Sequence, residues 1–276
     1  MNMNEDTLIP LTTVISLANM IREMNRKGIE LKRITKTAAL LLDGGYSPNS
    51  VPNVILDRCL RKQHPDGGWV GIVDTMWNAF FLSRMNDKTF APVIRKALDF
   101  ILSQKNEDGL WGRSQRDISR IPVTGILFYL FPQLADTDSL RLLEKLWISE
   151  KNSITYKAGY TLMAFHRGGY EPEDKTLVPG TINWLIDNQE DDGGFSPWKT
   201  HPVESDVFCT SIALLGLLQY EETVPEDIFQ KGFMWLRQKR LKTGIWRYHE
   251  IEDGASWGLY AWTKLLARKT GMPGAK

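Results

Sequence analysis

Apolar residues along this chain fall into two alternating kinds of segment. One kind is amphipathic: between Lys96 and Gln104, the residues Ala97, Phe100 and Ile101 recur at helical spacing on one face. The other kind follows a glycine turn and is apolar on nearly all sides, as in residues 121–131. A helix without a polar face has to be enclosed, so the alternation predicts helix pairs whose second member is buried.

A short motif recurs at the turns between the two kinds of helix. It begins with glutamine, bends at glycine and ends on an aromatic residue. Its four clear copies are Gln63 to Trp69, Gln104 to Trp111, Gln189 to Phe195 and Gln238 to Trp246. Asp66, Asp108, Asp191 and Asp192 stand in these turns, where we interpret them as turn formers in preference to metal ligands or catalytic groups.

The copies are regularly spaced. Trp69 and Trp111 are 42 positions apart, and Phe195 follows after a further 84, so a degenerate copy is expected near Asn152 and Ser153. The spacing predicts about six units of roughly 42 residues, which is typical of repeat architectures.

Two concentric rings of helices bury both kinds of segment, with the apolar helices inside and the amphipathic ones outside. Apolar and polar residues do not alternate in the manner of strands. We therefore predict an all-α fold, an α/α toroid that forms a single domain over residues 1–276. Its degenerate N-terminal repeat is expected at about 10–45 and its clear repeats at about 50–270.

The composition excludes several classes of protein. Hydrophobic residues make up 42% and charged residues 24%, as in ordinary globular chains. With 34 basic and 33 acidic residues, nothing favours nucleic acid as a partner, or more than peripheral contact with a membrane. Cys59 and Cys209 lack metal-finger spacing, which argues against a disulfide framework. The first residues are acidic and lack a signal-peptide core, so we expect a cytoplasmic location.

Three fragments carry the turn motif together with the helix before it. They read KALDFILSQ then GLW, GTINWLIDNQ then GGF, and KGFMWLRQ then GIW, within residues 96–111, 180–195 and 231–246. They resemble the QW repeat of squalene–hopene cyclase and related class II terpenoid cyclases, and protein prenyltransferase β subunits share a weaker form of it. The resemblance implies an α/α barrel with a ligand cavity at its axis.

The resemblance also implies where acid chemistry would lie. Class II cyclases protonate an alkene or epoxide with a DxDD motif at the start of one inner helix. In the matching stretch Asp206 falls on the first Asp and Val207 on the variable position, whereas Phe208 and Cys209 replace the last two. In another inner helix Asp74 could match the final Asp of the motif.

Any proton donor would therefore be a different carboxylic acid from that of the family. Desolvation in an apolar barrel keeps such a group protonated near neutral pH, and the best placed candidates are Asp206, Glu204 and Asp74. The alternative is structural, because Asp206 and Asp74 each precede an apolar helix, where Asp commonly serves as an N-cap.

Aromatic residues on the predicted inner helices could bind the substrate. Ring faces stabilise carbocations, although large rings also simply fill a core. The residues that we expect to line the cavity are Trp77, Phe208, Tyr160, Trp257 and Tyr260.

We predict no metal and no cofactor. Magnesium would be needed only for a substrate with a diphosphate, and no complete DDxxD-type cluster is present. Asp206, Cys209 and His249 have the residue types of the prenyltransferase zinc site, but Ala255 occupies the slot of that family's zinc-binding histidine.

The leading hypothesis is a terpene cyclase-like enzyme, an isomerase or lyase, that binds a linear isoprenoid or similar apolar small molecule in the barrel and promotes acid-initiated cyclisation or isomerisation. One alternative is a non-catalytic toroid that binds a lipid, a peptide or a partner protein, which a plugged cavity would favour. Others are a zinc-dependent prenyltransferase-like barrel, with a partner subunit, and a carbohydrate-active barrel with paired carboxylates such as Asp74 and Asp206.

Overall fold

The computed structural model describes residues 10–150 and 153–270, and every regular element in this part of the chain is helical. The degenerate turn expected near Asn152 lies partly outside the described residues. No described helix is long and apolar enough to cross a membrane. The elements are α1 (Leu11–Arg26), α2 (Leu31–Asp43), η2 (Pro48–Ser50), α3 (Asn53–Arg61), α4 (Ile72–Ser103), α5 (Ile121–Leu130), η3 (Pro132–Leu134), α6 (Thr137–Glu150), α7 (Thr155–Arg167), α8 (Leu177–Asp187), α9 (Val207–Leu218), η4 (Glu221–Thr223), α10 (Glu226–Lys239) and α11 (Ile251–Thr270).

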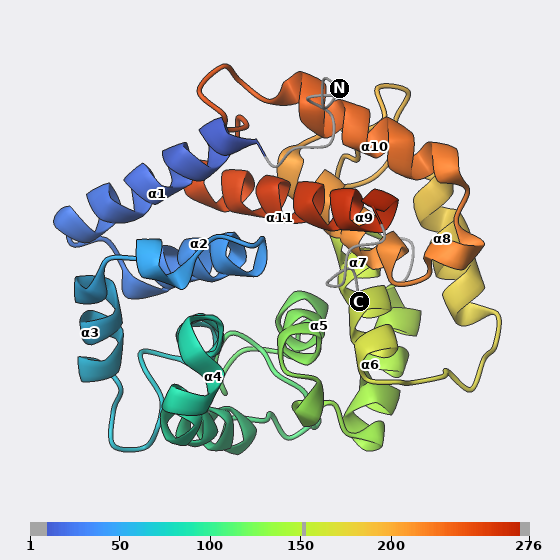
Figure 1. Ribbon diagram of the computed structural model, residues 1–276. Helices are drawn as coiled ribbons and strands as arrows, with labels where there is room; N and C mark the ends of the chain where they lie inside the picture. The colour runs from blue at the N-terminus through green and yellow to red at the C-terminus, as the bar shows by residue number, and fades with distance from the viewer. Residues whose placement is uncertain (1–9, 151–152, 271–276) are drawn as a thin grey trace.

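The helices form two concentric rings. Figure 1 shows α1, α3, α6, α8 and α10 arranged around α2, α5, α7, α9 and α11, and α4 supplies one member to each ring. Each inner helix contacts the next along the chain, and α11 contacts α2, which closes the ring. The inner helices are the nearly all-apolar segments, as their burial requires. The predicted all-α toroid of helix pairs is confirmed.

Helix α4 is an inner and an outer helix joined without a loop. Asn86, in its middle, has extended backbone angles of φ −169° and ψ 100°. Its side-chain oxygen accepts a hydrogen bond of 2.9 Å from the peptide N–H of Thr89, as an N-cap does. The outer half therefore begins directly after Asn86 and is longer than the stretch from Lys96 to Gln104 that the sequence indicated.

The repeated turn joins each outer helix to the inner helix that follows. The indole nitrogens of Trp69, Trp111 and Trp246 donate to a carbonyl ten residues earlier, in the outer helix, at distances of 2.7 to 2.9 Å. The peptide N–H groups of Trp69, Trp111 and Phe195 donate to a threonine hydroxyl in the first turn of the inner helix. These two contacts fix the relative position of the two helices.

The bend of the motif depends on glycine and aspartate. The glycine at each bend has a positive φ of 82° to 92°, which side chains disfavour. These glycines are Gly67, Gly109, Gly193 and Gly244. The carboxylates of Asp66, Asp108 and Asp192 accept a hydrogen bond from the peptide N–H two residues later, which confirms their interpretation as turn formers.

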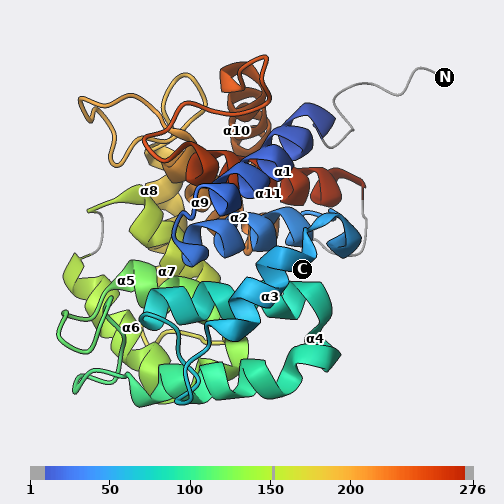
Figure 2. The ribbon, with the colours of Figure 1, turned by 90° about the vertical axis from the view of Figure 1, so that its left-hand side faces the viewer.

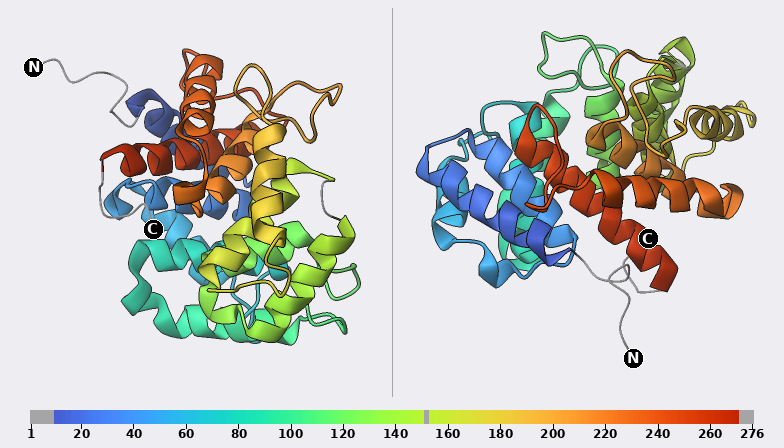
Figure 3. Two further views of the ribbon diagram at one scale, coloured as in Figure 1. Left: turned by 90° about the vertical axis from the view of Figure 1, so that its right-hand side faces the viewer. Right: turned by 90° about the horizontal axis from the view of Figure 1, so that it is seen from above.

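The two ends of the barrel differ. The loops that lead from outer to inner helices project at one end, on the left in Figure 2 and on the right in the left panel of Figure 3. We call this end the amino-terminal mouth, because the inner helices begin there. The opposite end, where α2, α5, α7 and α9 finish, is the carboxy-terminal mouth.

Glycines bring the inner helices α5, α7 and α9 into close contact. A β-carbon at Gly159 would lie 2.4 Å from the carbonyl oxygen of Ile212, and one at Gly216 would lie 2.6 Å from the Cα of Gly159. A β-carbon at Gly125 would lie 2.9 Å from the carbonyl oxygen of Tyr160. No side chain fits at these positions without moving a helix backbone, so the glycines set the width of the ring on this side.

We predict that Gly159→Ala destabilises the protein by roughly 1–3 kcal/mol, the usual cost of overpacking a core. Gly180→Ala is the matched control, because no atom lies within 4 Å of its β-carbon and alanine favours the helix α8. Urea unfolding measures both. Equal stability of the two variants would contradict the close approach of α7 and α9.

Candidate functional site

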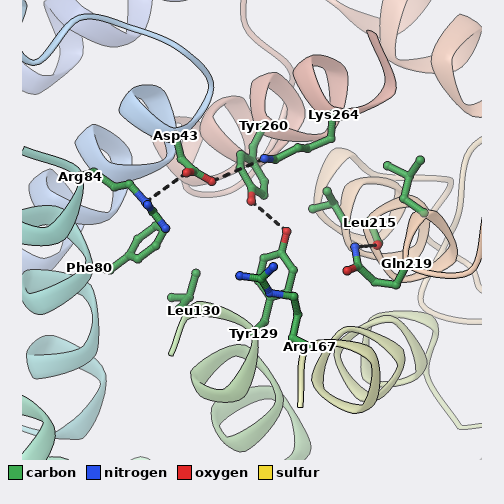
Figure 4. A pocket seen from close by; sticks show the side chains of 11 residues that line it. Asp43, Phe80, Arg84, Tyr129, Leu130, Arg167, Leu215, Gln219, Tyr260 and Lys264 are labelled. Atoms are coloured by element: carbon green, nitrogen blue, oxygen red, sulfur yellow. Dashed lines mark hydrogen bonds and ion pairs between the residues drawn. The ribbon is translucent and has the colours of Figure 1, made fainter. Parts of the chain in front are cut away.

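A cavity of about 300 Å³ lies on the barrel axis near the carboxy-terminal mouth (Figure 4). Every inner helix contributes to its wall, because all of them converge on the axis. The lining residues are Asp43 of α2, Phe80 and Arg84 of α4, Tyr129 and Leu130 of α5, Arg167 of α7, Leu215 and Leu218 of α9 with the C-cap residue Gln219, and Tyr260 and Lys264 of α11.

Charged groups surround the opening of this cavity. Arg84 Nε lies 3.1 Å from Asp43 Oδ1, and Lys264 Nζ lies 3.9 Å from Asp43 Oδ2. The guanidinium of Arg167 lies over the ring of Tyr129, 5.9 Å from its centroid, and forms no ion pair with another described residue. Three cations face a single carboxylate, so the opening carries an excess of two positive charges.

Two buried tyrosines connect opposite walls of the cavity. The hydroxyl groups of Tyr129 and Tyr260 are hydrogen-bonded at 2.9 Å. Burial raises the pKa of both hydroxyls, so both stay protonated at neutral pH. Burial also lowers the pKa of Lys264; Asp43 opposes this shift, whereas Arg84 and other nearby cations add to it.

Aromatic side chains pack on the axis between this cavity and the amino-terminal mouth. The ring of Trp257 lies 6.0 Å from that of Trp77 and 6.4 Å from that of Phe208, measured between centroids. Tyr160 lies 6.5 Å from Phe208. We call these four residues the aromatic cluster. Trp257 also contacts Tyr260 at 5.9 Å, which makes the cluster continuous with the cavity wall.

Comparison with known proteins agrees with this architecture, although no protein-family model matches the chain. Lanosterol synthase of Candida albicans is 32% identical over 108 residues, a match that spans 36% of this chain and only 14% of that protein. A variant of type II terpene cyclase MstE from Scytonema, in complex with the substrate geranylgeranyl dihydroxybenzoate, has a TM-score of 0.66 and 12% identity, and the match covers 92% of this chain and 98% of MstE. For apo MstE the TM-score is 0.61 and the identity is 11%, and the match covers 94% of this chain and 99% of MstE.

This chain has the fold of type II terpene cyclases. The predicted resemblance to class II cyclases is thereby confirmed, since the structural match to MstE extends over nearly the whole of both chains. At 11% and 12% identity, the likeness to MstE concerns the fold and not the reacting groups.

Within this terpene cyclase fold, Asp206 is a helix cap. It is the N-cap of α9, and its Oδ1 accepts a hydrogen bond of 2.8 Å from the peptide N–H of Cys209. The helix begins at Val207, directly after Asp206, because the capping residue has extended backbone angles. Asp206 lies at the amino-terminal mouth and does not line the axial cavity.

The other two predicted acids also lie away from the axial cavity. Glu204 is exposed in the loop before α9. Asp74 is half-buried in the first turn of α4, 3.7 Å from Lys32 Nζ, and burial raises the pKa of its carboxyl. It lines a separate cavity of about 590 Å³ between α2, α3 and the start of α4. The structure therefore does not bring the three acids together with Tyr260 in one cavity.

Sequence reasoning missed an ion pair between the aromatic cluster and the amino-terminal mouth. Asp253, in the first turn of α11, lies 2.5 Å from Lys36 Nζ. That ammonium group lies 5.1 Å from the ring centroid of Trp77 and 5.5 Å from that of Trp257. The pair lines a small cavity of about 90 Å³ at the amino-terminal mouth. Asp253 has the same position in its helix as Asp74, at the start of an apolar run, and this signal could have revealed it.

The charged lining of the axial cavity was missed as well. Asp43, Arg84, Arg167 and Lys264 each lie at or beyond the carboxy-terminal end of an apolar run. A charge at that position faces the end of the barrel axis in every case. The apolar runs indicated the aromatic residues within them and gave no indication of the charged residues at their ends.

The described part of the chain does not bring together the residues of the zinc-site alternative. In residues 10–150 and 153–270, no group of three His, Cys, Asp or Glu side chains is positioned to hold a metal. Cys209 lies beside Asp206, whereas His249 is exposed. Burial raises the pKa of the Cys209 thiol.

We predict that Asp206→Ala lowers the free energy of unfolding by about 1 kcal/mol, the usual value of an N-cap. The free energy of unfolding of Asp206→Asn should stay within a few tenths of a kcal/mol of the wild-type value, because asparagine caps equally well. Thermal and urea unfolding distinguish the two. A loss of equal size in both variants would show that the negative charge, and not the cap, stabilises α9.

Proposed function

We propose that this protein is a terpene cyclase-like enzyme that binds a linear isoprenoid, or a similarly apolar chain, on the barrel axis and promotes its acid-initiated cyclisation or isomerisation. The observation that carries the proposal is the row of contacting aromatic rings from Trp77 and Trp257 to Tyr260, the last of which lies on the cavity wall. A carbocation that forms next to such rings is stabilised by their faces.

Part of the wall of the axial cavity is apolar and suits a prenyl chain. Phe80, Leu130 and Leu215 supply apolar wall, and the Tyr129 and Tyr260 hydroxyls bond to each other and leave their ring carbons facing the space. The carbohydrate alternative lacks support here, because the amides and acids that a sugar ring requires are few. The likeness to MstE, whose complex contains a geranylgeranyl compound, agrees with a prenyl chain.

Among the predicted acids, Asp74 is our first candidate for the proton donor. Its pKa is raised by burial, so a larger fraction of it stays protonated at a given pH than for an ordinary aspartate. Asp206 ranks second, because its carboxyl oxygen is already engaged as the N-cap of α9. Glu204 ranks third because it is exposed. Asp74 lines the cavity of about 590 Å³, and Lys32 lines both this cavity and the small cavity at Trp77.

We predict that purified protein converts at least one member of a panel of linear isoprenoids, with and without a diphosphate and magnesium, to a cyclic or isomerised product detected by mass spectrometry. Asp74→Asn should lower the rate by about 10²- to 10⁴-fold, the usual contribution of a general acid. Asp57→Asn, at an exposed position on α3, is the control and should leave the rate unchanged. Wild-type activity of Asp74→Asn would remove Asp74 from the mechanism.

The pH dependence has a defined sign. The pKa of Asp74 is raised above its ordinary value of 3.8, and only its protonated form can donate. We therefore expect kcat/KM to fall as pH rises through that pKa, at a higher pH than for an ordinary aspartate. A rate that rises over the same range would identify a general base in place of an acid.

A toroid that binds without catalysis is the second candidate. Dense packing of the aromatic cluster favours it, because Trp77, Tyr160 and Trp257 are at most 5% exposed and fill the axis above the cavity. Binding of isoprenoids without any product across the panel would support this candidate.

A further inference from the structure

We infer that the carboxy-terminal mouth of the axial cavity binds an anionic group, a carboxylate or a phosphate ester, at one end of the ligand. The inference rests on the proposed function only for the apolar chain that follows this group. It makes the ligand an amphiphile, with its charged end at the opening and its chain directed along the axis.

The cations come from three separate inner helices and converge on one space. Arg84 ends the inner half of α4, Arg167 ends α7, and Lys264 lies on α11, and Figure 4 shows the three side chains around the opening. Asp43 is the one carboxylate in the lining and already pairs with Arg84 and Lys264. Arg167 has only the Tyr129 ring opposite it among the described residues, so this guanidinium is free to take a ligand oxygen.

The electrostatics of the opening favour an added negative charge. The Lys264 side chain is only 18% exposed, and the nearby Arg84 makes its positive charge less favourable, which the lowered pKa reflects. An anion between Arg167 and Lys264 would offset this repulsion. Arginine suits this role because its planar guanidinium binds carboxylate and phosphate oxygens in pairs.

Stabilisation of helix ends is the structural alternative for these charges. Cations near the carboxy-terminal end of a helix interact favourably with its dipole. That role explains a charge at each helix end, but it does not require the charges to enclose a cavity of about 300 Å³. It also predicts no dependence of ligand affinity on the charge.

Isothermal titration calorimetry with the full chain tests the inference, with farnesyl phosphate, farnesol and inorganic phosphate as probes. We expect farnesyl phosphate to bind wild type at least tenfold more tightly than farnesol. Arg167→Gln should weaken the affinity for farnesyl phosphate at least tenfold and change the affinity for farnesol by less than twofold, because only the charged end contacts Arg167. Arg95→Gln, at an exposed position on the outer half of α4, is the control and should change neither.

The remaining outcomes separate the possible explanations. If inorganic phosphate binds as tightly as farnesyl phosphate, the site binds a free anion, and the inference that the ligand is an amphiphile is overturned. Equal affinity of farnesol and farnesyl phosphate, no binding of either, or an unchanged affinity in Arg167→Gln would overturn the inference.

Failure of the proposed function is a distinct result. Turnover of farnesyl phosphate with the same kcat/KM in wild type and Arg167→Gln would support the enzyme and contradict the anion site. Binding of farnesyl phosphate that depends on Arg167, without turnover of any isoprenoid, would support the anion site and contradict the enzyme. Arg167 is exposed, so the variant should fold, and its unchanged melting temperature is the check.

Discussion

The hydrogen bond from each turn tryptophan to a carbonyl ten residues earlier sets the position of the inner helix that follows. Because the same turn also bonds to a threonine in that inner helix, the two helices of a pair are held at a fixed offset. Both contacts occur at the turns before α4 and α5, and one of the two occurs at the turns before α9 and α11. The inner helices begin at one mouth and end at the other. The different chemistry of the two mouths is a consequence of this arrangement.

The axis changes in character from one mouth to the other. Acidic groups such as Asp74, Asp206 and Asp253 lie at the amino-terminal mouth, where the positive ends of the helix dipoles favour carboxylates. Rings fill the middle, and cations surround the opening at the carboxy-terminal mouth. An amphiphile with an anionic end fits this order in one orientation only, with its chain directed toward the acids.

The fold could be predicted from the sequence because its determinants are local and repeated. The turn motif fixed the number of helix pairs, and the apolar runs identified the inner helices. The site could be predicted only in part. The inner helices bring the five predicted aromatic residues to one axis, but only Tyr260 among them lines the axial cavity. Asp206 and Tyr260 lie toward opposite mouths of the barrel. Which end of the axis stays open depends on the packing of Trp77 and Trp257, and no single segment of sequence specifies that packing.

The central claim is that the cavity between Tyr129, Leu215 and Lys264 is the ligand site. The most direct test is a crystal structure of the protein with farnesyl phosphate. We predict electron density for the phosphate within hydrogen-bond distance of Arg167 and Lys264, with the chain against Tyr260. Density in the cavity beside Asp74, with the axial cavity unchanged, would contradict the account.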